Sequence, residues 1–566
     1  MFKEYKEKIT NFYPNHWQGY LKTMWVEAII NPSFMKKSLK WIEECIATKS
    51  AEELELLFIK RLNYITKQFT KTKIESNKEK IERLQRAFIY FNMMENFVED
   101  NKFVQEVLYQ IKIKNPNNYL EIIANMDKKQ RSCKSLEESM RVKISEDVPE
   151  ELRFYLLLKK WQDVMHFFYY EIAIDKNKFL ENELLGNSID KNEFINMMNM
   201  TDIRLKNYLR TKIISLKEIV LLLEIGCEKV VKELYGGKGY GLAVLRKLGY
   251  TVPNAFVIPA DYEDLNNLKF IKSNKHYAVR SSANIEDGSS KSFAGMFSSF
   301  LDVKSNEIKN KIMLVRDSVK SDRVKTYMSS NNLKTDIHMA VIVQEFEKPS
   351  HAGVWFGTDI DKGVLEYVYG DGESLVSGHQ TPTREVWKIK KVKNKLTYKN
   401  GSIGSSLIKL QKKIIEQYNV LPDIEWCIVN NQLKFLQFRP ITTKISISLK
   451  EEQENNDNNM FVGIPCSPGK ISGICQFLKS PQQYHDFDSG NILLAMYTDP
   501  DWLPAIEKSS GVVTAIGGFL CHTAIICREL GIPCVVGVGM DYLEKINNKK
   551  ITLNGTTGEV KLEDKK

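Results

Sequence analysis

The chain has 566 residues, of which 43% are hydrophobic and 27% charged. This composition is ordinary for globular protein, and the length suits three or four domains. The net charge of +10 comes without an arginine-rich arm or a zinc-finger spacing. It therefore indicates a solvated surface that attracts anionic nucleotides, and we expect no binding of nucleic acid.

Targeting signals and cysteine patterns exclude several other classes. No apolar stretch reaches transmembrane length, and the first residues lack the apolar core of a signal peptide. We therefore expect a cytoplasmic protein that does not bind membranes. The nine cysteines contain no CxxC pair, which favours reduced thiols over a disulfide framework or a structural zinc site.

Residues 1–222 predict an all-helical domain. Glycine and proline are rare here, and apolar residues recur three and four positions apart in the stretches 51–69, 78–98 and 151–172. The run 161–170 is rich in aromatic residues. Such a run suits either an apolar ligand pocket or a simple helical core.

From residue 226 to residue 445 the sequence changes to strands and short helices punctuated by glycine. Gly236 to Leu242 reads Gly-Gly-Lys-Gly-Tyr-Gly-Leu and opens a helix. Glycines let a backbone approach phosphate oxygens closely, and Lys238 adds a mobile positive charge. Because no Ser or Thr follows the lysine, this is not a Walker A loop. A glycine-rich turn is weak evidence when it stands alone.

Further motifs follow this turn in chain order. A strand ends with Arg280 and two serine hydroxyls, and a small-residue loop around Gly295 comes next. Four more motifs complete the series, at residues 340–346, 370–378, 423–426 and 436–442. In this order they resemble the ATP-grasp nucleotide-binding domain of the family that includes phosphoenolpyruvate synthase, pyruvate phosphate dikinase and rifampin phosphotransferase.

The resemblance implies that ATP is bound. It implies that Lys238 and Arg280 hold the phosphates and that the loop around Gly295 closes over them. The strand that carries Gln344 and Glu345 would pack against adenine. The implied ATP-binding residues are Lys238, Arg280, Gly295, Gln344, Glu345, Glu373 and Arg439.

The last two strands of this region carry candidate ligands for Mg²⁺. Glu425 and Gln437, on neighbouring strands, could face one site and offer the hard oxygen atoms that Mg²⁺ prefers. Arg439 lies two residues beyond Gln437, so it points to the same face of its strand. There it could neutralise charge that develops on a transferred phosphoryl group. Each of these residues, taken alone, also suits an ordinary surface charge.

Residues 446–460 are polar and lack apolar periodicity, which predicts a flexible linker. A segment of this length reaches tens of ångströms when extended, as a tether between two distant sites must. An ordinary surface loop is the alternative interpretation.

Residues 461–564 contain His522 after a Gly517-Gly518 pair and before an amphipathic helix. Unpaired N–H groups and the positive end of the helix dipole suit a negatively charged group on this imidazole. The position predicts a phosphate carrier, although a structural histidine also fits a strand–helix turn. Gly531 predicts the end of the helix, and a short buried strand is predicted at 532–536.

Four motifs in this segment, at 463–469, 498–504, 517–537 and 554–560, resemble the swivelling phosphohistidine domain of the same family. The synthases and dikinases usually carry a threonine two residues before the histidine, where a regulatory kinase modifies it. Leu520 stands at that position, so we expect no regulation of that kind.

The expected fold is therefore multidomain, with an all-α N-terminal domain, an α+β ATP-grasp domain and an α/β swivelling phosphohistidine domain. In the family, the counterpart of His522 attacks the β-phosphate of ATP, which leaves AMP and a pyrophosphorylated histidine. The outer phosphate is lost, and the domain delivers the remaining one to an acceptor. A neutral imidazole is a competent nucleophile for this chemistry, and the resemblance makes His522 and Arg439 the catalytic residues.

The acceptor is the open part of the prediction. No pyruvate-binding barrel follows the histidine segment before Lys566, so we expect a small-molecule acceptor bound by the helical region. Residues 149–218 resemble the helical substrate domain of rifampin phosphotransferase. Two alternatives stay open, namely an ATP-dependent ligase or condensing enzyme of natural-product synthesis, and a phosphate-relay protein that acts on a partner protein. The sequence does not set the oligomeric state.

Overall fold

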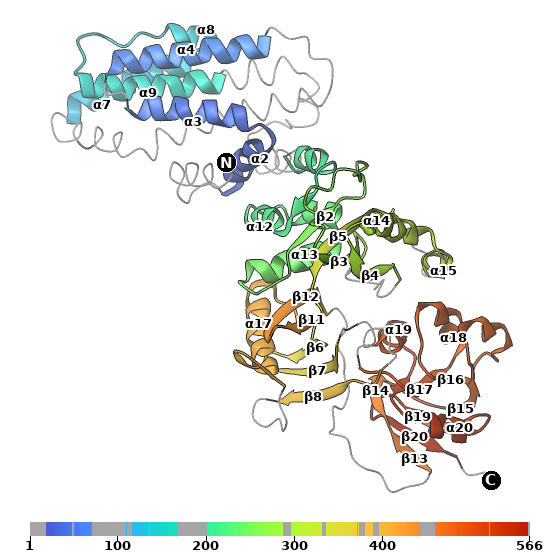
Figure 1. Ribbon diagram of the computed structural model, residues 1–566. Coiled ribbons are helices and arrows are strands. Elements are labelled where there is room, and N and C mark those ends of the chain that lie inside the picture. Colours follow the sequence, from blue (N-terminus) through green and yellow to red (C-terminus); the bar gives the residue numbers. More distant parts are fainter. Residues whose placement is uncertain are drawn as a thin grey trace. The chain divides into compact units, whose positions relative to one another are not determined.

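A computed structural model describes most of the chain (Figure 1). The described residues are 18–47, 50–70, 109, 116–134, 136–167, 201–286, 296–330, 336–370, 372, 380–388, 396–441, 459–519 and 521–563. The chain divides into two compact units, Met1–Tyr208 and Leu209–Lys566. The helix expected at 78–98, nearly all of the expected linker, Gly295 and Glu373 lie outside the described residues.

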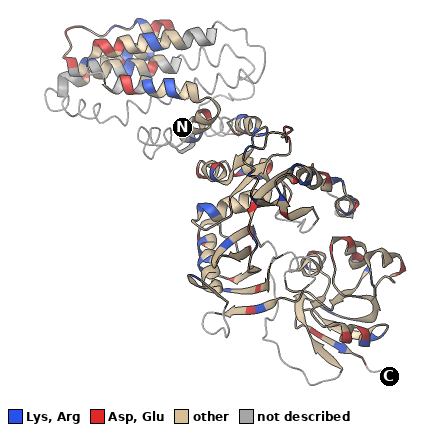
Figure 2. Cartoon of the chain, viewed as in Figure 1, with Lys and Arg blue, Asp and Glu red and all other residues tan. Residues whose placement is uncertain are grey.

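The described elements of the first unit are helices. They are α2 (Gln18–Ile30), α3 (Pro32–Ala47), α4 (Ala51–Thr70), α7 (Pro116–Ser132), α8 (Leu136–Arg141) and α9 (Glu150–Phe167). Phe58 of α4 stacks on Trp161 of α9 at 5.0 Å between ring centroids, and Trp41 of α3 meets Phe58 edge-on at 5.8 Å. Basic and acidic side chains are interspersed along these helices (Figure 2), which is typical of a solvated surface.

The boundary expected at residue 222 is corrected by the start of the second unit. Strand β1 (Ile214–Ser215) pairs with β2 (Ala255–Ile258), and α12 (Leu216–Glu224) follows directly. Ser215 and Glu218 form a capping box at the start of α12, which fixes this helix next to the strand. Residues 209–222 therefore belong with the sheets that follow. Their helical period is indistinguishable from that of the first unit, which explains the error.

The described residues between 209 and 441 form two five-stranded sheets and a short hairpin of β9 (Thr397–Tyr398) and β10 (Gly401–Ser402), and we call this part the two-sheet region. Its first sheet has the order β1-β2-β5-β3-β4, with antiparallel neighbours. The strands are β3 (His276–Ala283), β4 (Ser299–Lys304) and β5 (Met339–Phe346), and the helices of this part are α13 (Glu228–Lys247), α14 (Ile308–Asp317) and α15 (Asp322–Ser330).

The second sheet of this region has the order β12-β11-β6-β7-β8 and is also antiparallel. Its strands are β6 (His351–Asp359), β7 (Lys362–Tyr369), β8 (Thr383–Lys388), β11 (Pro422–Val429) and β12 (Gln432–Pro440), and α17 (Ile403–Tyr418) precedes β11. The mixture of helices and sheets agrees with the α+β composition expected here.

One face of the second sheet gathers most of the polar residues discussed below. Directly opposed residues of neighbouring antiparallel strands point to the same face, as do residues two apart on one strand. One cross-strand row consists of Gln437, Glu425, Val354, Glu366 and Arg384. A second row, two residues along each strand, contains Arg439, Asp423 and Phe356. We call this side of the sheet the site face.

Residues 459–563 form a histidine region around one sheet with the order β13-β20-β19-β15-β16-β17-β18-β14. Its centre is parallel and consists of β15 (Lys470–Phe477), β16 (Ile492–Ala495), β17 (Gly511–Thr514) and β18 (Cys534–Val536). The antiparallel strands are β13 (Met460–Val462), β14 (Ile464–Ser467), β19 (Lys550–Asn554) and β20 (Glu559–Leu562), and the helices are α18 (Leu503–Lys508), α19 (His522–Leu530) and α20 (Met540–Ile546).

The predicted helix after the glycine pair is confirmed. Helix α19 begins at His522 and is capped by Gly531, whose φ of 69° lies in the left-handed region. Glycine adopts this conformation without a steric penalty. Strand β18, buried throughout, follows where a short buried strand was expected.

Candidate active site

The glycine-rich turn before Lys238 packs a helix against two strands. Gly236 has a φ of 71° and interrupts the helical geometry of α13. A Cβ atom at Gly236 would lie 2.1 Å from the carbonyl oxygen of Ser282, and one at Gly241 would lie 2.2 Å from that of Phe438. At these two positions, glycine therefore permits close approach to the protein's own backbone. The expectation that this turn also approaches phosphate oxygens stays a prediction.

Packing of α13 places Lys238 at the end of β3. Its Nζ donates to Oε1 of Glu286 at 2.7 Å and to Oγ of Ser281 at 2.9 Å. Glu286 is buried, and its Oε2 accepts from the backbone N–H of Ala283 at 2.8 Å. Sequence reasoning did not single out Glu286. The only signal was an acidic residue shortly after Arg-Ser-Ser.

Arg280 connects the first sheet to the second. Its NH2 donates to Oε2 of Glu425 at 2.7 Å and to Oε1 of Gln437 at 3.1 Å, and its NH1 donates to the carbonyl of Leu436 at 2.9 Å. Glu425 and Gln437 are directly opposed on β11 and β12. The structure thus places the two implied metal ligands, Glu425 and Gln437, at the guanidinium group of Arg280, an implied phosphate ligand.

Electrostatics keep Glu425 ionised. Burial alone would raise its pKa, but the positive charges of Arg280, Arg439 and Lys238 outweigh burial and lower it. One oxygen of Glu425 and one of Gln437 accept from the guanidinium group of Arg280. Carboxylate and amide oxygens are also ligands that suit Mg²⁺. A metal ion would take these oxygens only after Arg280 turns away from them. Among the described residues, no group of three or more His, Cys, Asp or Glu side chains could hold a metal ion.

Arg439 and Asp423 form an ion pair on the site face. Nε of Arg439 donates to Oδ2 of Asp423 at 2.6 Å, and the two residues are directly opposed on β12 and β11. The Asp423 side chain is only 9% exposed. Asp423 therefore orients one edge of the guanidinium, a role that its sequence motif did not reveal.

The two residues expected near adenine point to opposite faces of β5, because side chains alternate along a strand. Gln344 opposes Ala278, so it shares the face of Arg280. Gln344 is buried, and its Nε2 has no hydrogen-bond partner in the described part of the chain. A buried amide without a partner is costly, so this donor is available to a ligand. Glu345 instead accepts from Nζ of Lys275 at 2.6 Å.

His522 is buried at the first position of α19, with 5% of its surface exposed. Neither ring nitrogen has a hydrogen-bond partner among the described residues. Burial, together with the positive charge of Arg323, lowers the pKa of His522 from 6.5 to about 4. The imidazole is therefore neutral near pH 7 and keeps a lone pair for nucleophilic attack.

Contacts with the neighbouring motif fix the start of this helix. Thr523, the residue after His522, shares a hydrogen bond of 2.7 Å with Thr498, and both side chains are buried. Thr498 lies in the loop between β16 and the short 3-10 helix Pro500–Trp502, which precedes α18. The histidine is thereby anchored to the centre of its own region.

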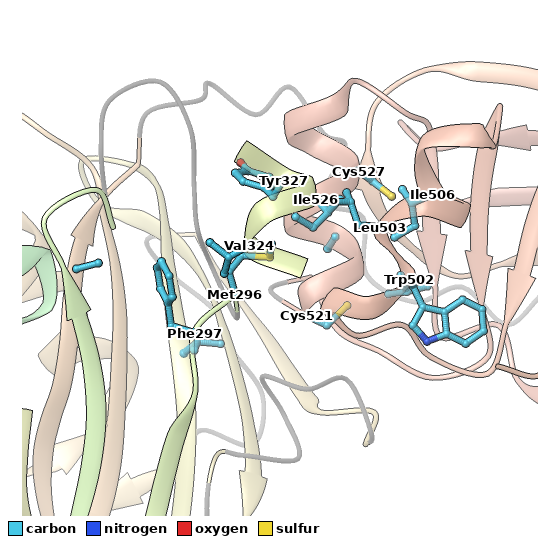
Figure 3. Packing of buried hydrophobic residues seen from close by; sticks show 14 of the residues in the cluster. Met296, Phe297, Val324, Tyr327, Trp502, Leu503, Ile506, Cys521, Ile526 and Cys527 are labelled. Carbon is cyan, nitrogen blue, oxygen red and sulfur yellow. The ribbon is translucent and has the colours of Figure 1, made fainter. Parts of the chain in front are cut away.

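The loop before His522 lies on the site face. The backbone N–H of Phe519 donates to Oε1 of Glu366 at 2.8 Å, and Nε of Arg384 lies 4.0 Å from the same oxygen atom. Tyr327 of α15 also donates to Oε2 of Glu529 in α19 at 3.3 Å. Figure 3 shows Val324 and Tyr327 beside Ile526 in the shared hydrophobic cluster. The histidine region therefore docks on the two-sheet region.

Two segments of the chain, one in the two-sheet region and one in the histidine region, match models of known protein families. Residues 261–409 match the AMP/ATP-binding domain of pyruvate phosphate dikinase, and residues 487–558 match the mobile domain of PEP-utilising enzymes. These two segments of the chain are similar to PEP-utilising enzymes. The ATP-binding match covers Arg280, Gln344 and Glu366, and the mobile-domain match covers His522.

Curated relatives of the family are similar over part of their length. A probable phosphoenolpyruvate synthase of Methanothermobacter thermautotrophicus is 31% identical over 51% of this chain and 47% of the relative. The phosphoenolpyruvate synthase of Aeropyrum pernix is 27% identical over 58% of this chain and 56% of the relative. The chain spans about half the length of the curated relatives it matches. No helix within the described residues is long and apolar enough to span a membrane.

The lowered pKa of His522 predicts a pH dependence of stability. Between about 6.5 and about 4, an unfolded chain takes up a proton at this histidine that the folded chain does not. The free energy of unfolding should therefore fall as pH decreases through this window. Denaturant unfolding at several pH values measures the slope, which should be smaller in His522→Ala. Equal slopes in the two proteins would contradict a neutral, buried imidazole.

Proposed function

We propose that the protein is an ATP-dependent phosphotransferase of the dikinase type, with His522 as the phosphate carrier. One observation carries this proposal. A buried, neutral histidine whose two ring nitrogens have no partner in the described chain begins a helix, and the loop before it docks on the sheet face of Glu425, Gln437 and Arg439. An ATP-grasp fold of the two-sheet region and a swivelling histidine region are parts of the same proposal.

Each residue then has a role in the first transfer. Lys238 and Arg280 bind the phosphates of ATP, and for this Arg280 leaves the oxygens of Glu425 and Gln437. These two oxygens would hold Mg²⁺, which neutralises phosphate charge when it is bound. Arg439, oriented by Asp423, stabilises charge that develops on the transferred group.

The bonds in the transfer balance as follows. A ring nitrogen of His522 attacks the β-phosphorus of ATP, the bond from this phosphorus to the oxygen it shares with the α-phosphate breaks, and AMP leaves with the negative charge. Water then removes the outer phosphate as inorganic phosphate. The remaining phosphoryl group passes to an acceptor hydroxyl, which releases its proton.

We assign the acceptor to the helical unit, as a small molecule. The aromatic residues Trp41, Phe58 and Trp161 meet there, and the indole N–H groups of both tryptophans are buried without a partner in the described chain. Because a buried donor without a partner is costly, these two groups favour a ligand with acceptor oxygens. Loss of phosphate from the phosphoenzyme on addition of a candidate hydroxyl compound tests the assignment.

Product analysis tests the proposed function. With ATP and Mg²⁺, we expect AMP and inorganic phosphate to appear together with an acid-labile phosphoenzyme. ATP labelled at the β-phosphate should leave label on the protein, whereas label at the γ-phosphate should end in inorganic phosphate. Nucleotide chromatography and intact-mass spectrometry measure these products. ADP as the sole nucleotide product would overturn the dikinase chemistry.

A further inference from the structure

Phe519 lies three residues before His522, and its ring packs against residues of both the histidine region and the two-sheet region. Its side chain is 1% exposed, although it lies in a connecting loop. The guanidinium carbon of Arg528 lies 4.8 Å from the ring centroid and belongs to the histidine region. Two further neighbours of the ring, Phe356 at 5.4 Å and Arg384 at 5.6 Å, belong to the two-sheet region.

The geometry of these contacts is specific. The Phe356 ring meets the Phe519 ring edge-on, at an interplanar angle of 78°, which is a favoured aromatic arrangement. The two guanidinium groups lie near enough for cation–π attraction to the ring. Phe356, Glu366 and Arg384 come from the adjacent strands β6, β7 and β8 and all lie on the site face. Together they form a seat for one side chain.

The backbone on either side of Phe519 is fitted to the same seat. A Cβ atom at Gly518 would lie 2.7 Å from Oε2 of Glu366 and 2.7 Å from Cγ of Pro382. The carbonyl of Phe519 accepts from NH1 of Arg528 at 2.9 Å. Arg528 therefore holds the loop from inside the histidine region, while Glu366 holds its N–H from outside.

We propose that Phe519 is the docking anchor that positions His522 for phosphate transfer from ATP. This inference rests on the proposed function. The ring contacts with Phe356 and Arg384 exist only when the two regions are docked, because these two residues belong to the two-sheet region. Undocking would expose the Phe519 ring to water, so its burial favours the docked position. The anchor lies three positions before the nucleophile in the chain, so it controls where the imidazole lies relative to the site face.

The experiment replaces the ring and separates binding from transfer. In Phe519→Leu, we expect the rate of phosphoenzyme formation at saturating ATP to fall on the order of 100-fold, because small misplacements of reacting groups have effects of this size. The affinity for ATP should stay unchanged, since the ring contacts of Phe519 with Phe356, Arg384 and Arg528 involve none of the proposed ATP ligands. Phe519→Tyr, which keeps the ring face, should retain most of the rate.

A matched control separates anchoring from packing. Phe487 is a buried phenylalanine of the same region, and Phe487→Leu removes the same volume there. We expect it to lower thermal stability at least as much as Phe519→Leu does, with a normal rate of phosphoenzyme formation. Equal losses of rate in the two variants would overturn the proposal. A wild-type protein that forms no phosphoenzyme would instead refute the proposed function itself.

A double-mutant cycle tests the contact directly. Arg384→Gln removes the guanidinium that faces the ring from the two-sheet region. If Phe519 acts through this seat, the double variant with Phe519→Leu should be slower than wild type by clearly less than the product of the two single effects. Fully multiplicative effects would show that the two side chains act independently and would overturn the anchor.

Discussion

Replacement of His522 by alanine is expected to abolish phosphoenzyme formation and release of AMP. The neutral imidazole is the proposed nucleophile, and removal of a nucleophile lowers rates by as much as about a million-fold. The ATP ligands lie on other strands and helices, so nucleotide binding should persist. Intact-mass spectrometry after incubation with ATP and Mg²⁺ measures the loss of the phosphoryl adduct, and nucleotide chromatography measures the loss of AMP.

A second histidine of the same region supplies the control. His485 is exposed, in the short helix that precedes Phe487, and His485→Ala should form the adduct at the normal rate. An adduct that persists in His522→Ala would assign the phosphate to another side chain. Equilibrium dialysis with ATP under the same conditions verifies that the inactive variant still binds nucleotide, so loss of the fold is distinguished from loss of the nucleophile.

Features with a local cause were predictable from the sequence. The start of α19 at His522 and its end at Gly531 follow from residues within one or two helical turns. The pairing of β11 with β12 also needed little more than a tight turn at Asn430 and Asn431. The direct opposition of Glu425 and Gln437 depends in addition on a shift of register between Glu425 and Trp426, which two strands and a turn do not predict. The roles proposed for these residues stay predictions, because geometry alone does not test them.

Features that depend on distant pairing were not predictable in the same way. Glu366 meets the loop of Phe519 across more than a hundred residues of sequence, and Arg384 joins it only through the register of β7 and β8. A charged residue within the apolar run of β7 was the one available signal for Glu366. The predicted domain boundary at residue 222 differs from the observed one because it also depends on distant pairing. Strand β1 pairs with β2, and this pairing decides where the helical unit ends.

Replacement of Arg439 by alanine is expected to slow phosphoenzyme formation by about 100-fold to 1,000-fold, because one preorganised charge on the transferred group has effects of this size. Arg439→Lys should recover only part of the rate, since an ammonium lacks the planar fork that Asp423 orients. Rapid-quench measurement of the phosphoenzyme gives the rates. Arg141→Ala, at an exposed arginine of α8, is the control and should be fully active.

Loss of stability must be separated from this loss of rate. Arg439→Ala leaves the carboxylate of Asp423 buried without its partner, so the variant should also unfold at a lower temperature. In the double variant Arg439→Ala/Asp423→Asn, the uncompensated charge is gone, and we expect the unfolding temperature to recover while transfer stays slow. If the unfolding temperature and the rate of transfer both recover in the double variant, Arg439 and Asp423 form a purely structural ion pair. Unchanged release of AMP in Arg439→Ala would remove Arg439 from the active site.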